Sequence, residues 1–180
     1  MRGGSLARMV FHLAVICFLL QLLTIPSARA QSVRTVFLIR HADKASDEAD
    51  APLSDAGRRR AACLADMLSD ARVARIFTSD LQRTQQTAAP LAARLHLTPV
   101  AIPLAHPERL VEAVRASKGG NIVVVWHDQT LPKIIQDLGG PDIPPIAHTE
   151  YDRFLILTWP LEKAESTANL ITLRYCDELK

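Results

Sequence analysis

The sequence predicts an α/β fold in which a mostly parallel sheet carries helices on both faces. Apolar segments of strand length alternate along the chain with segments whose apolar residues recur at helical spacing. Two of the strand-like segments, residues 35–39 and 122–126, run directly into polar residues that include His41 and His127. Because ligands bind at the carboxyl edge of open parallel sheets, the same pattern predicts a site at that edge.

The first thirty residues are expected to be a leader rather than part of the fold. Arg2 and Arg8 precede an apolar run at 9–23, and residues 28–30 supply the small side chains of a signal-peptidase site, so cleavage before Gln31 is expected. The run of 15 residues is short for a membrane span of about 20, and an uncleaved anchor is the alternative. Both interpretations predict export, so we expect a periplasmic or secreted protein.

The remainder, residues 31–180, suits one domain, because no linker, repeat or low-complexity tract divides it. Removal of residues 1–30 takes away three arginines and no acids. It leaves 18 basic and 19 acidic residues, so the formal charge of +2 becomes −1. A nucleic-acid-binding protein would need a basic face on the mature chain. We therefore expect no nucleic-acid partner, and no membrane span in the mature form.

The first strand organises the chain. Residues 35–39 are largely β-branched or apolar, which is typical of a buried strand, and they stop at Arg40, His41, Asp43 and Lys44. An arginine and a histidine at the end of a stiff strand are well placed to meet an anionic substrate.

The first helix is expected to begin after Ser54, a good N-cap residue. Its core-facing stripe has the spacing i, i+3, i+4, i+7: Ala61, Leu64, Ala65 and Leu68. The three arginines at 58–60 are expected to begin on or near the solvent side, as a solvated helical face rather than a phosphate patch.

The second strand, 75–79, leads into a helix that Asp80 is expected to cap. The core stripe of that helix is Ala88, Leu91, Ala92 and Leu95. Arg83 falls in its first turn, where a cation is unfavourable for the helix dipole. A phosphate bound at that helix end would use the cation directly.

The later elements follow the same alternation. A third strand at 98–102 lies between prolines and is expected to be short or at an edge. A helix starts at Pro107, the clearest central strand is 122–126, and glycines at 139 and 140 end the next helix. Two last strands are expected at 154–159 and 170–175.

Three of these segments resemble motifs of the histidine phosphatase superfamily, the phosphoglycerate-mutase-like proteins. Residues 40–42, Arg-His-Ala, resemble its Arg-His-Gly/Ala signature. Residues 78–88 resemble its Ser-Ser-x-x-x-Arg-x-x-Gln-Thr-Ala segment, and 124–132 resemble its second catalytic histidine with the helix that follows. The matches keep the family's order and cover most of residues 35–175. The resemblance implies a three-layer sandwich.

Phosphoryl chemistry accounts for these residue types. A phosphoryl group needs cationic, planar donors for its peripheral oxygens, a role that suits Arg40 and Arg83, while a nucleophile attacks in line. A neutral His41 can attack with one ring nitrogen while the other donates to a carbonyl. His127 suits a further donor to the phosphoryl group. The resemblance implies a transient phosphohistidine at His41 and a phosphate pocket formed by Arg40, Arg83 and His127. Lys44 is expected to be a further substrate-binding residue. No metal or cofactor is needed.

The general acid is left open between two carboxylates. Asp128 follows the second histidine, as in the acid-phosphatase and phytase branch, where a His-Asp pair supplies the proton donor. Glu108 lies in the segment from which the other branch draws its acid. Asp128 could instead cap the next helix, Glu108 could be a first-turn helix acid, and water or the substrate could supply the proton. We favour Asp128.

Two further alternatives concern metal and sulfur. A metal site could combine His41, Asp43, His127 and Asp128, but it lacks the close histidine spacing of a zinc site and leaves both arginines unexplained. Cys63 lies in a predicted core helix. We therefore expect buried free thiols rather than a Cys63–Cys176 disulfide, which an oxidising compartment would allow.

The sequence thus predicts an exported, metal-independent phosphomonoesterase that acts on a small or envelope-linked phosphate ester. The alternative is a catalytically inactive phosphate-binding or interaction module of the same fold. The remaining histidines are expected to be peripheral: His96 at a helix end, and His106 and His148 in connecting segments.

Overall fold

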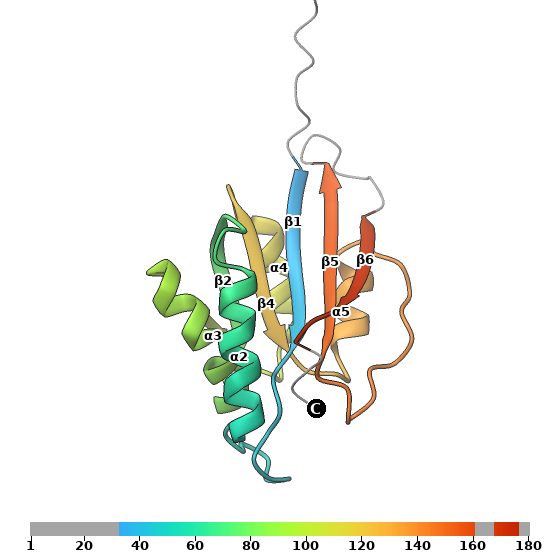
Figure 1. Cartoon of the computed structure of the whole chain (residues 1–180). Coiled ribbons are helices and arrows are strands. Elements are labelled where there is room, and N and C mark those ends of the chain that lie inside the picture. The colour runs from blue at the N-terminus through green and yellow to red at the C-terminus, as the bar shows by residue number, and fades with distance from the viewer. Residues whose placement is uncertain (1–32, 161–167, 177–180) are drawn as a thin grey trace, which may run out of the picture. The chain divides into compact units, whose positions relative to one another are not determined.

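The structure, a computed structural model, describes residues 33–160 and 168–176 (Figure 1). The expected leader, residues 1–30, and its cleavage before Gln31 therefore lie outside the described residues.

The described residues form a six-stranded mixed sheet with the order β3-β2-β4-β1-β5-β6. The strands are β1 (Val33–Arg40), β2 (Val73–Ser79), β3 (Val100–Ile102), β4 (Asn121–Trp126), β5 (Arg153–Pro160) and β6 (Asn169–Arg174). The first four are parallel, and β5 is antiparallel to both of its neighbours, β1 and β6. The predicted mostly parallel α/β sheet is confirmed, and β3 lies at an edge as expected.

Within the described ranges, four helices cover the two faces of the sheet: α2 (Asp55–Met67), α3 (Gln82–Leu95), α4 (Pro107–Ala116) and α5 (Leu131–Asp137). Successive strand side chains point to opposite faces. Ile39 therefore joins the core cluster of α2 and α3, whereas its neighbour Leu38 joins that of α4 and α5. In the described part of the chain, no helix has both the length and the apolar character needed to cross a membrane.

Helix α2 starts as the sequence predicts, because the Ser54 hydroxyl accepts a hydrogen bond of 3.1 Å from the backbone N–H of Gly57. A Cβ atom at Gly57 would overlap the carbonyl oxygen of Asp43. The glycine thus lets the helix start directly against the residues that follow β1. The predicted core stripe, residues 61, 64, 65 and 68, is buried.

The expectation of a solvated face at residues 58–60 is wrong for Arg60, which is 2% exposed. One helical turn separates Arg60 from Leu64, so both side chains lie on the core-facing side. The guanidinium is stabilised there by partners: its Nε donates to the Asp43 carboxylate at 2.8 Å, and its Nη1 donates to the Cys176 carbonyl at 3.1 Å.

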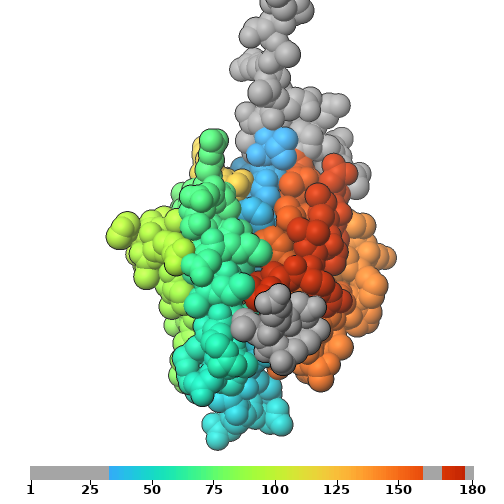
Figure 2. All heavy atoms as spheres, viewed as in Figure 1, coloured from blue at the N-terminus to red at the C-terminus, as the bar shows by residue number. Residues whose placement is uncertain are grey.

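The expectation of free thiols is also wrong, because Cys63 and Cys176 form a disulfide with their Cα atoms 6.3 Å apart. Figure 2 shows why: the segment around the end of β6 lies beside α2 on the same face of the molecule. The two cysteines are 113 residues apart in sequence, and only the sheet order brings them together.

The expected cap of α3 is wrong as well. The N-cap position is Leu81, and no side chain caps the helix from there. Asp80 instead accepts a hydrogen bond of 2.9 Å from the backbone of Leu104. The backbone N–H of Gln82 donates at 2.7 Å to Asp50, a carboxylate from the loop before α2. The start of α3 is thus satisfied by a residue that is distant in sequence.

Candidate active site

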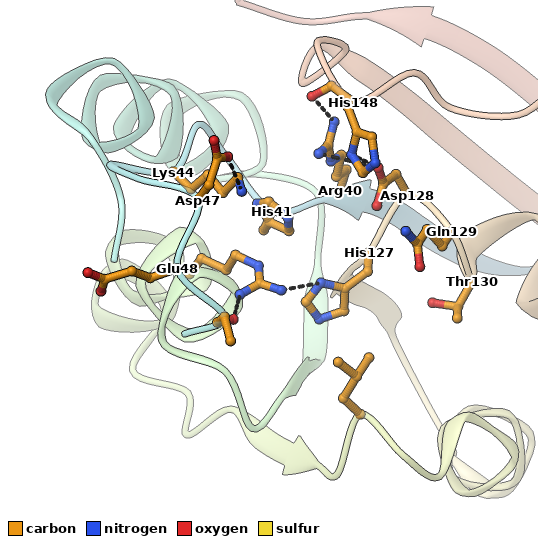
Figure 3. Close-up of a pocket in the computed structure, with 13 residues that line it drawn as sticks. Arg40, His41, Lys44, Asp47, Glu48, His127, Asp128, Gln129, Thr130 and His148 are labelled. Atoms are coloured by element: carbon orange, nitrogen blue, oxygen red, sulfur yellow. Dashed lines mark hydrogen bonds and ion pairs between the residues drawn. The ribbon is translucent and has the colours of Figure 1, made fainter. Parts of the chain in front are cut away.

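The carboxyl ends of β1, β2 and β4 meet at one edge of the sheet, where a cavity of about 350 Å³ opens (Figure 3). Six of the seven predicted site residues line it: Arg40, His41, Lys44, Arg83, His127 and Asp128. The seventh, Glu108, does not line the cavity; it is exposed on α4 and pairs with His106 at 3.0 Å.

His41 is held by its backbone and by one ring nitrogen. Its N–H donates to the Trp126 carbonyl at 2.9 Å, which extends the pairing of β1 with β4. The ring Nδ1 lies 2.8 Å from the carbonyl oxygen of Ala42. Since a carbonyl only accepts, we assign the proton to Nδ1, which leaves the Nε2 lone pair free to attack.

Burial keeps this ring neutral. Desolvation lowers the pKa of His41 to about 3, with smaller contributions in the same direction from Arg40, His127 and Arg83, although the hydrogen bond to Ala42 opposes the shift. A neutral imidazole is the nucleophilic form.

Thr87 of α3 fixes the residue that orients His41. Its hydroxyl accepts from the backbone N–H of Ala42 at 2.9 Å and donates to the Arg83 carbonyl at 2.7 Å. Thr87 belongs to the segment that resembles the Gln-Thr-Ala motif, and the structure gives this threonine a positioning role that sequence reasoning did not assign.

His127 faces His41, with the two ring centroids 5.3 Å apart. Its Nε2 lies 2.8 Å from the Ser79 hydroxyl, and its Nδ1 lies 3.3 Å from Nη2 of Arg83. A guanidinium only donates, so Nδ1 accepts and Nε2 carries the proton. Burial, and then the charges of Arg83 and Arg40, lower the pKa of His127 to about 3. To donate to a phosphoryl oxygen, Nδ1 must first take up a proton.

Arg83 connects the cavity wall to the loop before α2. Its Nη1 donates to the Ala49 carbonyl at 2.7 Å, while its Nη2 meets His127 (Figure 3). Its Nε is buried and has no hydrogen-bond partner in the described part of the chain. The guanidinium of Arg83 thus brings a positive charge to the cavity wall, which suits a bound phosphate.

Arg40 has a structural role beyond the predicted one. It is 2% exposed, and its Nη1 donates to the carbonyls of Ala147, His148 and Glu150 at 2.8 to 3.0 Å. Its guanidinium carbon lies 4.1 Å from the centroid of the Tyr151 ring. Arg40 thus fixes the segment before β5 to the cavity edge. Its Nε has no partner among the described residues.

Asp128 is buried, and its Oδ2 lies 3.3 Å from Nη2 of Arg40 and 2.8 Å from Nδ1 of His148. It does not cap α5, whose N-cap is Thr130 with no side-chain cap. Of the two predicted acids, only Asp128 reaches the cavity.

Among the cavity-lining residues that sequence reasoning missed, three are ionisable: Asp47, Glu48 and His148. Lys44 and Asp47 form an ion pair of 2.7 Å at its rim. Asp47 and Glu48 lie in the acidic segment after Lys44, and this pattern could have indicated them. His148 lies in a proline-rich connection whose path is set by contacts with Arg40, so no local pattern marked it.

The structure does not bring together the four residues of the alternative metal site. Asp43 turns toward Arg60 and not toward the two histidines. Among the described residues, no group of three or more His, Cys, Asp or Glu side chains is arranged to hold a metal ion.

Comparison with known families identifies the segment that carries most of the site. A model of the histidine phosphatase superfamily (branch 1) matches residues 36–112. That segment belongs to the histidine phosphatase superfamily. The resemblance drawn from the motifs is therefore confirmed.

One curated relative is the uncharacterized protein Rv0525 of Mycobacterium tuberculosis. It is 33% identical over 113 residues, which are 62% of this chain and 53% of that protein. The chain thus spans about half the length of the curated relative that it matches.

Solved histidine phosphatase structures share the fold. The mycobacterial glucosyl-3-phosphoglycerate phosphatase Rv2419c is 16% identical with a TM-score of 0.60, covering 80% of this chain and 99% of its own. The protein histidine phosphatase SixA bound to tungstate is 20% identical with a TM-score of 0.59, covering 81% and 99%. A putative α-ribazole-5'-P phosphatase from Escherichia coli K-12 is 18% identical with a TM-score of 0.62, covering 79% and 97%. At 16% to 20% identity, these likenesses show the fold alone.

Proposed function

We propose that this histidine phosphatase superfamily member is an exported, metal-independent phosphomonoesterase that acts through a phosphohistidine at His41. The observation that carries the proposal is the state of His41: a buried, neutral ring whose Nδ1 is committed to the Ala42 carbonyl, so that Nε2 is left for attack. An imidazole with this tautomer, beside two arginines, suits in-line attack on a phosphoryl group.

The cations around His41 supply the electrostatic part of catalysis. Arg40 and Arg83 line the cavity, where their guanidinium groups carry the positive charge that a phosphoryl group requires, and Lys44 adds positive charge at the rim. His127 becomes a further donor once a phosphate dianion favours protonation of its Nδ1. Water then attacks the phosphohistidine and releases inorganic phosphate.

The proposed substrate is a small or envelope-linked phosphate ester. The names of the glucosyl-3-phosphoglycerate and α-ribazole-5'-P phosphatases refer to phosphate esters of small molecules, which supports this class. SixA is named a protein histidine phosphatase, and a phosphoprotein substrate of that kind is less favoured because the expected leader directs this chain out of the cytosol. The Cys63–Cys176 disulfide supports export, since disulfides persist in oxidising compartments.

Turnover of p-nitrophenyl phosphate by the purified protein, with and without a chelator, tests the proposal. We expect chelator-resistant turnover, acid-labile phosphate on the protein after rapid quenching, and loss of both in His41→Ala. Phosphate binding without turnover would instead establish an inactive binding module. Turnover that a chelator abolishes would establish a metal site.

A further inference from the structure

One imidazole at the cavity mouth has no role in the proposed function so far. His148 lines the cavity together with His41 and His127, and its side chain is 77% exposed (Figure 3). Its ring Nδ1 lies 2.8 Å from Oδ2 of Asp128. No contact occupies its Nε2 in the described part of the chain.

The position of His148 is fixed from two sides. Its backbone carbonyl accepts from Arg40 at 2.8 Å, as do the carbonyls of Ala147 and Glu150. The turn is closed by a hydrogen bond of 2.9 Å from the N–H of Glu150 to the carbonyl of Ala147. A ring held by Asp128 on a backbone held by Arg40 is oriented well enough for proton transfer.

Asp128 is less suited to donate the proton itself. Its Oδ2 already serves as the acceptor for two donors, Nη2 of Arg40 and Nδ1 of His148. The carboxylate is also buried behind the more exposed imidazole. The other carboxylates at the cavity are exposed, and Asp47 is paired with Lys44.

We propose that His148 is the general acid for the leaving group, and that Asp128 is a positioning residue that holds its imidazole. This inference rests on the proposed phosphomonoesterase function. In such an arrangement the carboxylate binds one ring nitrogen of the imidazole. It thereby fixes the orientation of the ring and determines which nitrogen faces the substrate.

The two half-reactions balance around one proton. In the first, the His41 Nε2 lone pair forms the N–P bond, the ester P–O bond breaks, and Nε2–H of the His148 imidazolium protonates the departing alkoxide. In the second, neutral His148 accepts a proton from the attacking water as the new P–O bond forms and the N–P bond breaks. Alcohol and phosphate leave, and both histidines return to their initial states.

The ionisable groups that face His148 come from three elements. Asp128 contacts the ring, Arg40 pairs with that carboxylate, and Asp47 lies on the same cavity wall in the loop after β1. The pKa of Asp47 is lowered chiefly by Lys44, and His148 contributes in the same direction. One carboxylate, that of Asp128, therefore contacts the imidazole, and a second, that of Asp47, lies on the same cavity wall.

The test compares His148→Gln with a matched control, His106→Gln. His106 is also exposed and also pairs through Nδ1 with a carboxylate, Glu108, but it lies outside the cavity wall. The substrates are p-nitrophenyl phosphate, whose leaving group needs no proton, and a sugar phosphate, whose alkoxide does. We expect His148→Gln to lose about 100-fold or more in kcat on the sugar phosphate and less than about tenfold on p-nitrophenyl phosphate. His106→Gln should match the wild type on both.

Two further measurements separate a proton donor from a structural residue. The pH profile of sugar-phosphate turnover should differ between the wild type and His148→Gln, whereas the profile of His106→Gln should match that of the wild type. Added imidazole should restore part of the sugar-phosphate rate to His148→Ala.

Equal losses on both esters in His148→Gln, or no loss on the sugar phosphate, would overturn the inference. A selective loss in Asp128→Asn together with a normal His148→Gln would assign the proton to Asp128 instead. Failure of the wild type to form phosphohistidine would refute the proposed function itself. The failure of the proposed function can therefore be distinguished from the failure of the inference about His148.

Discussion

His41 and His127 share one electrostatic environment but use their ring nitrogens differently. Burial is the main reason that the pKa of each is lowered to about 3. His41 keeps its Nε2 lone pair for attack, whereas the Nδ1 lone pair of His127 is occupied by Arg83. Substrate binding must therefore rearrange the contact between Arg83 and His127 but leave His41 as it is.

These lowered pKa values predict how stability depends on pH. In the unfolded chain a histidine binds its proton near pH 6.5, whereas in the fold both rings stay neutral down to about pH 3. The unfolded state thus binds more protons in this window, and the fold loses stability as pH falls from about 6.5 toward 3. We expect the loss to be of the order of a few kcal/mol per histidine. Urea unfolding at pH 7.5 and 4.5 measures it.

The control is the double variant His41→Gln/His127→Gln. Its free energy of unfolding should depend less on pH over the same interval, because the variant lacks the two histidines whose pKa values differ between the folded and unfolded states. An unchanged pH dependence would contradict the assignment of the effect to these rings.

Arg83 is predicted to stabilise the transition state. Arg83→Ala should lower kcat on p-nitrophenyl phosphate by about 100- to 1000-fold, which is the typical cost of losing one charge-stabilising donor. Arg59→Ala is the matched control, since Arg59 is exposed on α2 and does not line the cavity. Comparable losses in the two variants would mean that the phosphate pocket lies elsewhere.

At the scale of elements, helix α2 holds both the loop after β1 and the end of β6. Arg60 donates to the Asp43 carboxylate and to the Cys176 carbonyl, and Cys63 forms the disulfide one turn further along the helix. Asp43 lies two residues after His41. The buried arginine on α2 therefore supports the segment that carries the nucleophile.

Arg60→Ala is expected to destabilise the protein by about 2 to 3 kcal/mol, because it leaves the Asp43 carboxylate and a backbone carbonyl without their donor. Arg58→Ala should change the free energy of unfolding by less than about 1 kcal/mol, since the ion pair of Arg58 with Asp55 is exposed. Urea denaturation of both variants measures the difference. Equal values would mean that Arg60 is solvated after all.

At the scale of the whole described domain, the parallel order of β2, β4 and β1 brings three strand ends to one edge. The phosphate-binding candidates come from those ends and from the first turn of α3. The segment before the antiparallel β5 closes the other side of the cavity with His148.

The disulfide joins two cysteines that are 113 residues apart, so it closes a long loop of the unfolded chain. Reduction should lower the free energy of unfolding by about 2 to 4 kcal/mol, mainly because the unfolded chain regains conformational freedom. Denaturation with and without dithiothreitol measures the change. The variant Cys63→Ala/Cys176→Ala should resemble the reduced protein and be insensitive to dithiothreitol, and an equal response of variant and wild type would contradict this prediction.

Local pattern was enough to predict the elements and the strand-end residues. The alternation of strands and helices, the Ser54 cap and the approach of His41, His127 and Arg83 to one edge follow from short-range rules, because parallel strands place their carboxyl ends together. The motif resemblance then added the chemistry.

Only the tertiary structure decided the contacts between segments that are far apart in the chain. Arg60 is buried because β6 returns a carbonyl and a cysteine to α2, and Asp50 caps α3 from another loop. His148 reaches the cavity because Arg40 holds its backbone. The physical reason is common to all of them: a buried cation, a disulfide and a loop anchor each need a partner whose position depends on the order of strands in the sheet and not on neighbouring residues.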